Sequence, residues 1–262
     1  MEYNCTWREK DAPMTKKEKK TMKKIIALVL ALMMVLSLTA CAKDIHKKSE
    51  GVMTYAEYEA AELDTFLTIE GFVQAKQSWW DNKATLYIQD KDGAYFAYEV
   101  GCREDVYEQL VEGQKVQIAG YKAEWAGEVE IMDATVSVLE GNWIAEATDV
   151  TAKLGTDELA KHMNQKVAFK GLTVAPSYDA NGSEVGFLYN WDGSGAQGDD
   201  LYFNVSYNGN TYNFCVEKYL TGADTDVYKA VEGLQVGDTI DCEGFLYWYE
   251  GVNPHITSVT VK

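Results

Sequence analysis

The sequence is poor in the residues that most catalytic sites use. It contains three histidines, and a single arginine, Arg103, follows residue 40. His46, His162 and His255 stand apart from any serine, aspartate or cysteine pattern that is typical of a nucleophilic triad. A nuclease site would also need clustered arginines. We therefore predict that the chain is not an enzyme.

Cysteine is scarce as well, and its spacing excludes a zinc site. Cys5 and Cys41 lie near the N-terminus, which leaves Cys102, Cys215 and Cys242 for the folded part. There is no CxxC motif and no cluster of histidine and cysteine. Cys242 takes the place of Ile118 of the first copy, so we expect it to be a small buried residue, and the sequence does not show whether the three cysteines are free. A Cys215–Cys242 disulfide is the disfavoured alternative. The sequence predicts neither a metal site nor a cofactor.

Proline is rare, with three residues against 17 tyrosines, eight phenylalanines and seven tryptophans. This balance favours folded β-structure over disorder. Residues 1–40 hold eight basic and four acidic residues, which leaves 16 basic and 37 acidic residues and a net charge of −21 for the rest. Such a surface repels phosphate backbones. We therefore expect nucleic acid to be an unlikely partner.

The most informative feature is a repeat, in which residues 110–131 return as residues 234–256. One leucine and three glycines keep their spacing in both copies: Leu110, Gly113, Gly120 and Gly127, then Leu234, Gly237, Gly244 and Gly251. Alternating apolar residues between the first two glycines indicate a strand, and the last glycine indicates a hairpin turn. The chain is therefore a two-copy array.

Each copy contains the same further elements around this stretch. A short capped helix precedes a first strand, two strands joined by a tight turn follow, and a second short helix leads into the repeated pair. This order resembles the OB-fold, a five-stranded Greek-key barrel. The predicted fold is mainly β, with two tandem OB-fold-like barrels that each carry short helices, after an N-terminal lipoprotein signal peptide. Each copy has its own core and is expected to fold alone.

The N-terminal segment predicts export and anchoring. Lys23 and Lys24 precede an apolar run over residues 25–36, which is shorter than the roughly 20 residues of a spanning helix. Residues 38–41, Leu-Thr-Ala-Cys, resemble the bacterial lipobox, which implies cleavage before Cys41 and acylation of its thiol. An ordinary secretory signal is the alternative. Met22 is expected to be the true start of the protein.

The predicted boundaries are a signal peptide over 1–40, a lipidated tether over 41–53, a first domain over 54–139, a linker over 140–155 and a second domain over 156–262. The whole resembles OB-fold lipoproteins of Gram-positive gut bacteria. This resemblance implies the fold and a location on the extracytoplasmic face of the cell membrane, and it implies no activity.

Aromatic residues in the expected binding-side loops predict a non-enzymatic binding or interaction module. The candidate ligand-binding residues are Trp79, Trp80, Trp125, Trp191, Trp248 and Tyr249. Exposed aromatic rings beside amides and acids suit a glycan or a protein segment. The alternative for each ring is a place in the core at the end of a barrel.

Two further hypotheses remain. Lys76, Lys83 and Lys122 flank the tryptophan loops of the first copy and would suit single-stranded nucleic acid. Oxygen ligands at alternate positions over 179–184 and 192–194 suggest a calcium-binding surface protein, although the full loop pattern is missing. The sequence does not predict an oligomeric state.

Overall fold

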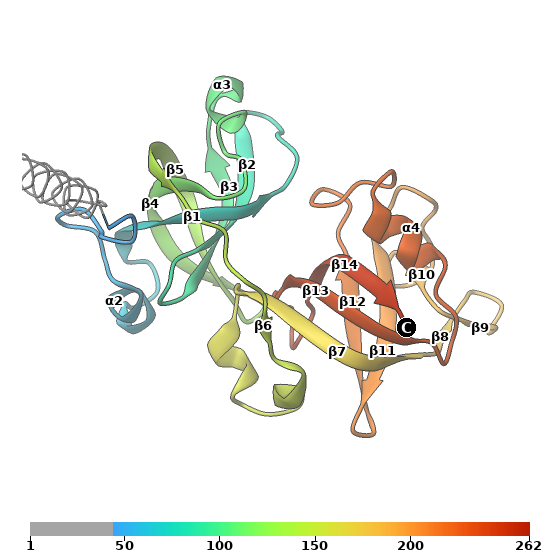
Figure 1. Cartoon of the computed structure of the whole chain (residues 1–262). Coiled ribbons are helices and arrows are strands. Elements are labelled where there is room, and N and C mark those ends of the chain that lie inside the picture. The colour runs from blue at the N-terminus through green and yellow to red at the C-terminus, as the bar shows by residue number, and fades with distance from the viewer. Residues whose placement is uncertain (1–43) are drawn as a thin grey trace, which may run out of the picture. The chain divides into compact units, whose positions relative to one another are not determined.

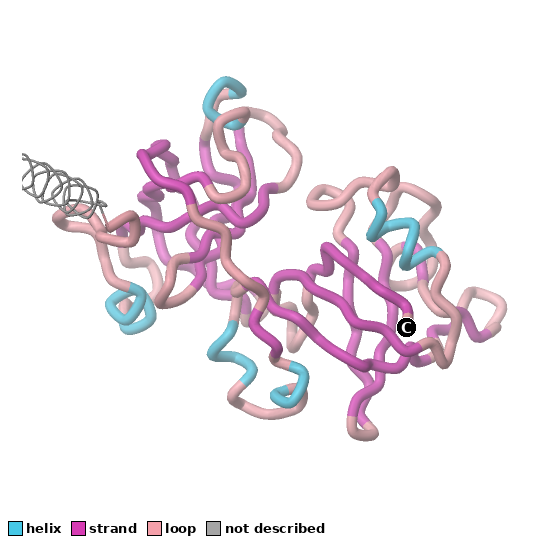
Figure 2. Tube along the Cα trace, viewed as in Figure 1, coloured by secondary structure: helices cyan, strands magenta, loops and turns pink. Residues whose placement is uncertain are grey.

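The computed structural model describes residues 44–262 (Figure 1). The signal peptide, Met22 and the acylation site Cys41 lie outside the described residues. Strands make up nearly half of the described chain and far outweigh the helices (Figure 2). Within residues 44–262, no helix combines the length and the apolar character that crossing a bilayer requires. The prediction of a mainly β protein with two five-stranded barrels is confirmed.

The first barrel, barrel 1, closes in the order β1-β2-β3-β5-β4. Its strands are β1 (Phe66–Lys76), β2 (Lys83–Gln89), β3 (Ala94–Gly101), β4 (Gln114–Trp125) and β5 (Glu128–Asn142). The β3–β5 pair is parallel, and the other pairs are antiparallel. Two short helices accompany it, α2 (Tyr55–Ala60) and α3 (Glu104–Tyr107). The side chain of Thr54 caps α2 through the predicted capping box.

The second barrel, barrel 2, repeats this topology. Its five strands are β7 (Lys166–Ala175), β11 (Leu201–Tyr207), β12 (Asn210–Val216), β13 (Thr239–Phe245) and β14 (His255–Val261). They pair in the same order, with β12 and β14 parallel. Helix α4 (Asp226–Glu232) corresponds to α3. The short capped helix expected before the first strand of the second copy is a single 3₁₀ turn, η2 (Leu159–His162).

Barrel 2 also carries short additions. They are β6 (Thr148–Asp149), the 3₁₀ turn η1 (Thr151–Lys153), β8 (Ser177–Tyr178), β9 (Glu184–Val185) and β10 (Leu188–Tyr189). Strand β6 pairs with β7, so part of the predicted linker belongs to the sheet of barrel 2. Strands β8 to β10 lie in the long segment between β7 and β11. This segment makes the loops of barrel 2 larger than those of barrel 1 (Figure 1).

Each barrel has its own apolar core, built from the inward residues of alternating strands. Barrel 1 buries Ile69, Ile88 and Ile118 among others, and barrel 2 buries Phe169 and Phe214 in the matching region. The described chain has three cysteines with free and buried thiols, of which burial was expected for Cys242: Cys102, Cys215 and Cys242.

The repeated glycines mark a close approach between strands. A Cβ atom on Gly120 would lie 2.7 Å from the Cβ of Ala134 and 2.7 Å from the carbonyl oxygen of Met132. A Cβ on Gly244 would meet the carbonyl of His255. In each barrel the register between the fourth and fifth strands shifts at this glycine. A side chain here would push these two strands apart, which explains why the glycine occurs in both copies.

Candidate ligand-binding face

The outer face of the second and third strands is the surface that OB barrels use to bind ligands. In barrel 1, Tyr87 of β2 and Phe96 of β3 lie opposite each other in the register. Their neighbours Leu86 and Ala97 belong to the core, so alternation turns Tyr87 and Phe96 outward. Nevertheless, Tyr87 is 0% exposed and Phe96 is 2% exposed. A part of the chain outside barrel 1 therefore covers this face.

Barrel 2 supplies that cover. Phe245, the last residue of β13, stacks on Tyr87 with 4.3 Å between the ring centroids and 17° between the planes. Tyr247 packs edge-to-face against Phe96 at a centroid distance of 5.3 Å. The loop after β13 thus occupies the face on which barrel 1 would otherwise bind a ligand.

A buried histidine adds a polar contact to this junction. The hydroxyl of Tyr87 lies 2.7 Å from Nδ1 of His255, and the imidazole stacks on Tyr247 with 4.3 Å between centroids. Burial lowers the pKa of His255 to about 3. The ring is therefore neutral at physiological pH, and it serves as a packing and hydrogen-bonding group.

Glu128, the first residue of β5, makes a second polar contact between the barrels. Its Oε1 accepts a hydrogen bond from Nδ2 of Asn164 at 2.6 Å, and its Oε2 accepts one from the backbone N–H of Trp248 at 2.9 Å. Burial raises the pKa of Glu128 to about 8, although both hydrogen bonds act to lower it. The face of barrel 1 is closed by polar as well as apolar contacts.

The corresponding face of barrel 2 is open and carries amide side chains. Asn204 of β11 lies opposite Asn213 of β12, and both point away from the core. Asn213 Nδ2 donates to Oδ1 of Asn204 at 3.0 Å. Asn253 Nδ2 donates to the carbonyl of Asn213 at 3.2 Å. We call these three asparagines the amide face.

The amide face continues toward the loop before β8. Asn204 Nδ2 donates to Oγ of Ser177 at 3.2 Å and to the carbonyl of Pro176 at 3.1 Å. The next residue, Tyr178, is 59% exposed. Ser206 and Thr211, which lie opposite each other, extend the same face with hydroxyl groups. None of these side chains is charged, so the surface can exchange hydrogen bonds with a neutral polar ligand and stack a ring of that ligand on Tyr178.

The structure separates the aromatic residues that the sequence singles out. Trp80 and Trp191 are 79% and 76% exposed, and Trp125 and Tyr249 are also exposed. Trp79 is half-buried, and its Nε1 donates to the carbonyl of Cys102 at 3.1 Å.

Trp248 is half-buried in the junction between the barrels, where its ring lies against Gly127. The hairpin after Trp125 and the loop of Tyr249 meet where the N–H of Glu250 donates to the carbonyl of Ala126 at 2.7 Å. Trp125 and Tyr249 therefore lie near the junction between the barrels, and neither belongs to the amide face.

The three lysines beside the tryptophan loops already have partners within the protein. Lys76 Nζ donates to the carbonyl of Tyr107 at 2.6 Å, and Lys83 pairs with Glu99 at 2.7 Å. Lys122 is buried and donates to three carbonyls in and just after α2, at 2.7 to 3.0 Å. These lysines do not form a shared exposed patch.

The two acidic loops use their oxygens internally. Oδ1 of Asp179 accepts hydrogen bonds from the backbone N–H groups of Asn181 and Ser183 at 2.9 and 2.8 Å. Oδ1 of Asp192 accepts one from Ser194 at 3.0 Å. Within residues 44–262, no group of three or more histidine, cysteine or acidic side chains is arranged to hold a metal ion.

The spacing of two asparagines around a turn could have predicted part of the amide face from the sequence. Asn204 and Asn213 stand at equal distances from the Asn208–Gly209 turn, so a two-residue hairpin loop pairs them directly. Asn253 could not be placed in the same way, because its contact with Asn213 depends on the course of the β13–β14 loop.

Comparison with known proteins finds similarity to solved structures only. No family model matches the chain, and no curated protein matches it. Among solved structures, a murine DNA-binding protein bound with double-stranded DNA is 10% identical, with a TM-score of 0.36 over 74% of this chain and 96% of that one. The Ifi202 HINa domain in complex with 20-base-pair double-stranded DNA is 12% identical, with a TM-score of 0.33 over 77% and 97%. A replication protein A heterotrimer bound to single-stranded DNA is 13% identical, with a TM-score of 0.31 over 82% and 51%.

These comparisons correct one expectation. The expectation that nucleic acid is an unlikely partner, which rests on the net charge, is wrong. Solved chains that resemble this one include HIN domains in complex with double-stranded DNA. Net charge averages over a whole surface, whereas a ligand meets one face, so the net charge by itself does not exclude nucleic acid.

Proposed function

We propose that the chain is a non-enzymatic binding module that holds a polar oligomer on the amide face of barrel 2. The observation that carries this proposal is the contrast between two equivalent faces. The face of barrel 1 is closed by Phe245 and Tyr247, whereas the face of barrel 2 presents Asn204, Asn213 and Tyr178. OB barrels bind oligosaccharides and oligonucleotides on this surface.

An oligosaccharide is the first candidate ligand. Sugar hydroxyls both donate and accept hydrogen bonds, and asparagine side chains offer both functions in a fixed geometry. The exposed ring of Tyr178 beside Ser177 provides a surface on which the apolar face of a sugar ring can stack. The uncharged amide face supports a neutral ligand of this kind.

Single-stranded nucleic acid is the second candidate. Asparagine amides pair with the donor and acceptor groups at the edges of bases, and exposed aromatic rings stack with bases without regard to sequence. Asn213 and Tyr178 offer both contacts. The salt dependence of binding separates the two candidates, because each neutralised phosphate steepens the fall of affinity with salt.

Replacing Asn213 by alanine is expected to weaken binding by about five- to tenfold, because one hydrogen-bonding group contributes about 1 kcal/mol. Tyr178→Ala should have an effect of similar size. Asn210→Ala is the matched control, since Asn210 lies on the opposite side of the same strand from Asn213. The measurement is calorimetric titration with neutral glycans and with oligonucleotides at several salt concentrations. Equal affinity of all three variants would contradict the placement of the site.

We further propose that the module is anchored by an acylated Cys41 on the extracytoplasmic face of a bacterial membrane. The lipobox-like residues 38–41 support this location. Cys41→Ala is expected to move the protein from the detergent phase to the aqueous phase on phase partitioning, because it removes the proposed acyl attachment point. Unchanged partitioning of this variant would contradict the anchor.

A further inference from the structure

The segment between the proposed anchor and α2 is docked on barrel 1. We call residues 45–53 the N-terminal clamp. His46 packs edge-to-face against Phe72 and Trp143, with centroid distances of 5.2 and 5.1 Å. At the other end of the clamp, the N–H of Met53 donates to the carbonyl of Thr68 at 2.9 Å. The clamp is therefore held at both ends.

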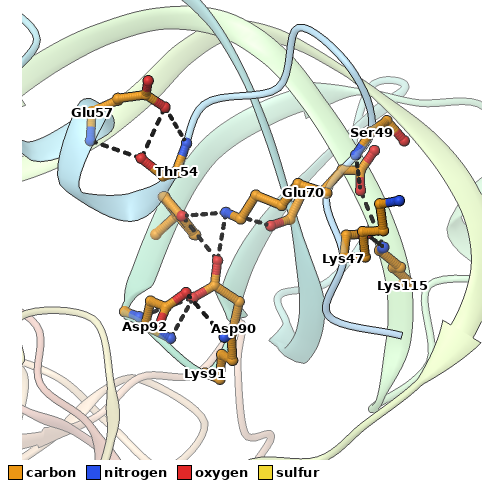
Figure 3. Close-up of polar contacts among 12 residues, drawn as sticks. Lys47, Ser49, Thr54, Glu57, Glu70, Asp90, Lys91, Asp92 and Lys115 are labelled. Atoms are coloured by element: carbon orange, nitrogen blue, oxygen red, sulfur yellow. Dashed lines mark hydrogen bonds and ion pairs between the residues drawn. The ribbon is translucent and has the colours of Figure 1, made fainter. Parts of the chain in front are cut away.

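An ion pair and hydrogen bonds also attach the middle of the clamp to barrel 1 (Figure 3). Lys48 Nζ lies 2.6 Å from Oδ2 of Asp90, and it also donates to the hydroxyl of Tyr95 at 3.0 Å. Asp90 is buried in the turn between β2 and β3. A buried carboxylate needs a partner, and the clamp brings this one a cation.

A second buried carboxylate, Glu70, has one partner in barrel 1 and one in the clamp. Lys115 Nζ lies 3.1 Å from Glu70 and donates to the carbonyl of Lys47 at 3.0 Å (Figure 3). The N–H of Ser49 donates to Glu70 at 3.3 Å. Burial acts to raise the pKa of Glu70, and the hydrogen bonds from Ser49 and Lys115 outweigh it, so that the pKa is lowered. Both carboxylates thus depend on the clamp for part of their partners.

The docked clamp leaves little chain between barrel 1 and Cys41. Four residue steps separate Cys41 from Ile45, and these span at most ~14 Å when fully extended. The mature part is strongly acidic, so an anionic headgroup layer would repel it. A loose tether would let the protein move away from the membrane, whereas a docked clamp would not.

We propose that the N-terminal clamp holds barrel 1 within about 14 Å of the headgroup layer of the membrane that Cys41 enters. This inference rests on the proposed anchor at Cys41. It predicts that the distance between barrel 1 and the bilayer is set by the clamp.

The test uses the acylated full-length protein in phosphatidylglycerol-containing vesicles. A donor dye is placed at the exposed β5 position by Ser137→Cys, and an acceptor dye is carried on lipid headgroups. Inserting 12 glycine and serine residues between Asp44 and Ile45 is expected to reduce energy transfer by roughly half, because the insertion adds a mean reach of ~20 Å without touching the barrel.

Lys48→Ala should reduce transfer in the same direction, since it removes the ion pair with Asp90. Lys91→Ala is the matched control, because Lys91 is an exposed lysine in the same turn and lies 4.0 Å from Asp92. It should leave transfer unchanged.

The outcomes separate a failure of the anchor from a failure of the clamp. If the protein fails to sediment with vesicles, the anchor is absent, and the proposal falls with it. If the protein sediments but the insertion leaves transfer unchanged, the anchor stands and the membrane-apposition proposal is overturned. If the insertion lowers transfer while Lys48→Ala does not, the ion pair does not hold the clamp, and that part of the proposal is overturned.

Discussion

Replacing Phe245 by alanine is expected to lower the free energy of unfolding by about 3–5 kcal/mol, the usual cost of truncating a fully buried phenylalanine. Phe245 is 2% exposed and stacks on Tyr87 of the other barrel. Its loss opens a cavity that both barrels share. The destabilisation should therefore appear in barrel 1 as well as in barrel 2.

Calorimetry and denaturant unfolding monitored at both barrels check this result. Tyr249→Ala is the control, because Tyr249 is an exposed aromatic residue four positions away and should change stability by less than about 0.5 kcal/mol. A single transition that moves as one is the expected result for Phe245→Ala. Two transitions, of which only one shifts, would contradict the coupling.

The coupling limits the independence of the two copies. Each copy contains five strands and a core, and on that ground each is expected to fold alone. Barrel 1 alone would expose Tyr87 and Phe96, which are covered by barrel 2 in the whole chain. An isolated barrel 1 is therefore expected to be less stable than it is in the intact protein.

The repeat made the fold readable from sequence. Alternation of apolar residues is a local property, so the strands of both copies could be placed, and the paired Gly120 and Gly244 indicated where strands approach closely. The binding surface could not be read in this way. Tyr87 and Phe96 alternate like exposed residues, and their cover comes from Phe245, more than 140 positions later in the sequence.

The same limit applies to the tryptophans. Trp80 and Trp248 both occur in loops, and nothing in their local sequence distinguishes an exposed ring from one packed at a junction. Trp248 is fixed at the junction because its backbone N–H donates a hydrogen bond to Glu128 of the other barrel. Contacts between distant segments decide such cases, and a single sequence does not reveal them.

The Glu128 contact makes stability depend on pH. The pKa of this carboxyl is about 8 in the folded protein, against an ordinary value of 4.5. Between these two values the folded state binds more protons than the unfolded state does. The stabilisation from the protonated carboxyl is therefore fully present below pH 4.5 and is lost as the pH rises through 8. The full shift corresponds to a loss on the order of 5 kcal/mol.

Two other buried groups shape the same pH range. Burial raises the pKa of Glu217 to about 7, which has the same sign as Glu128. Burial lowers the pKa of His255 from 6.5 to about 3, so its contribution is lost as the pH falls from 6.5 toward 3. Between about pH 4.5 and 6.5, His255 offsets one of the two carboxyls, so stability already falls with a slope of about one proton. It continues to fall up to about pH 8 as Glu217 and Glu128 ionise.

Glu128→Gln isolates the contribution of this carboxyl. An amide cannot ionise, and Oδ1 of Asn164, which is buried without a hydrogen-bond partner, can accept from the new amide if the Asn164 side chain turns over. The variant should resemble the wild-type protein near pH 5 and exceed its unfolding free energy by several kcal/mol, on the order of 4, at pH 8.5. Denaturant titrations of both proteins from pH 5 to 8.5 measure the difference. Glu124→Gln, an exposed change on the same hairpin, is the control. A constant difference between wild type and Glu128→Gln over this range would show that Glu128 stays ionised in the junction, held by Asn164 and Trp248, and would remove the pH dependence from the contact between the barrels.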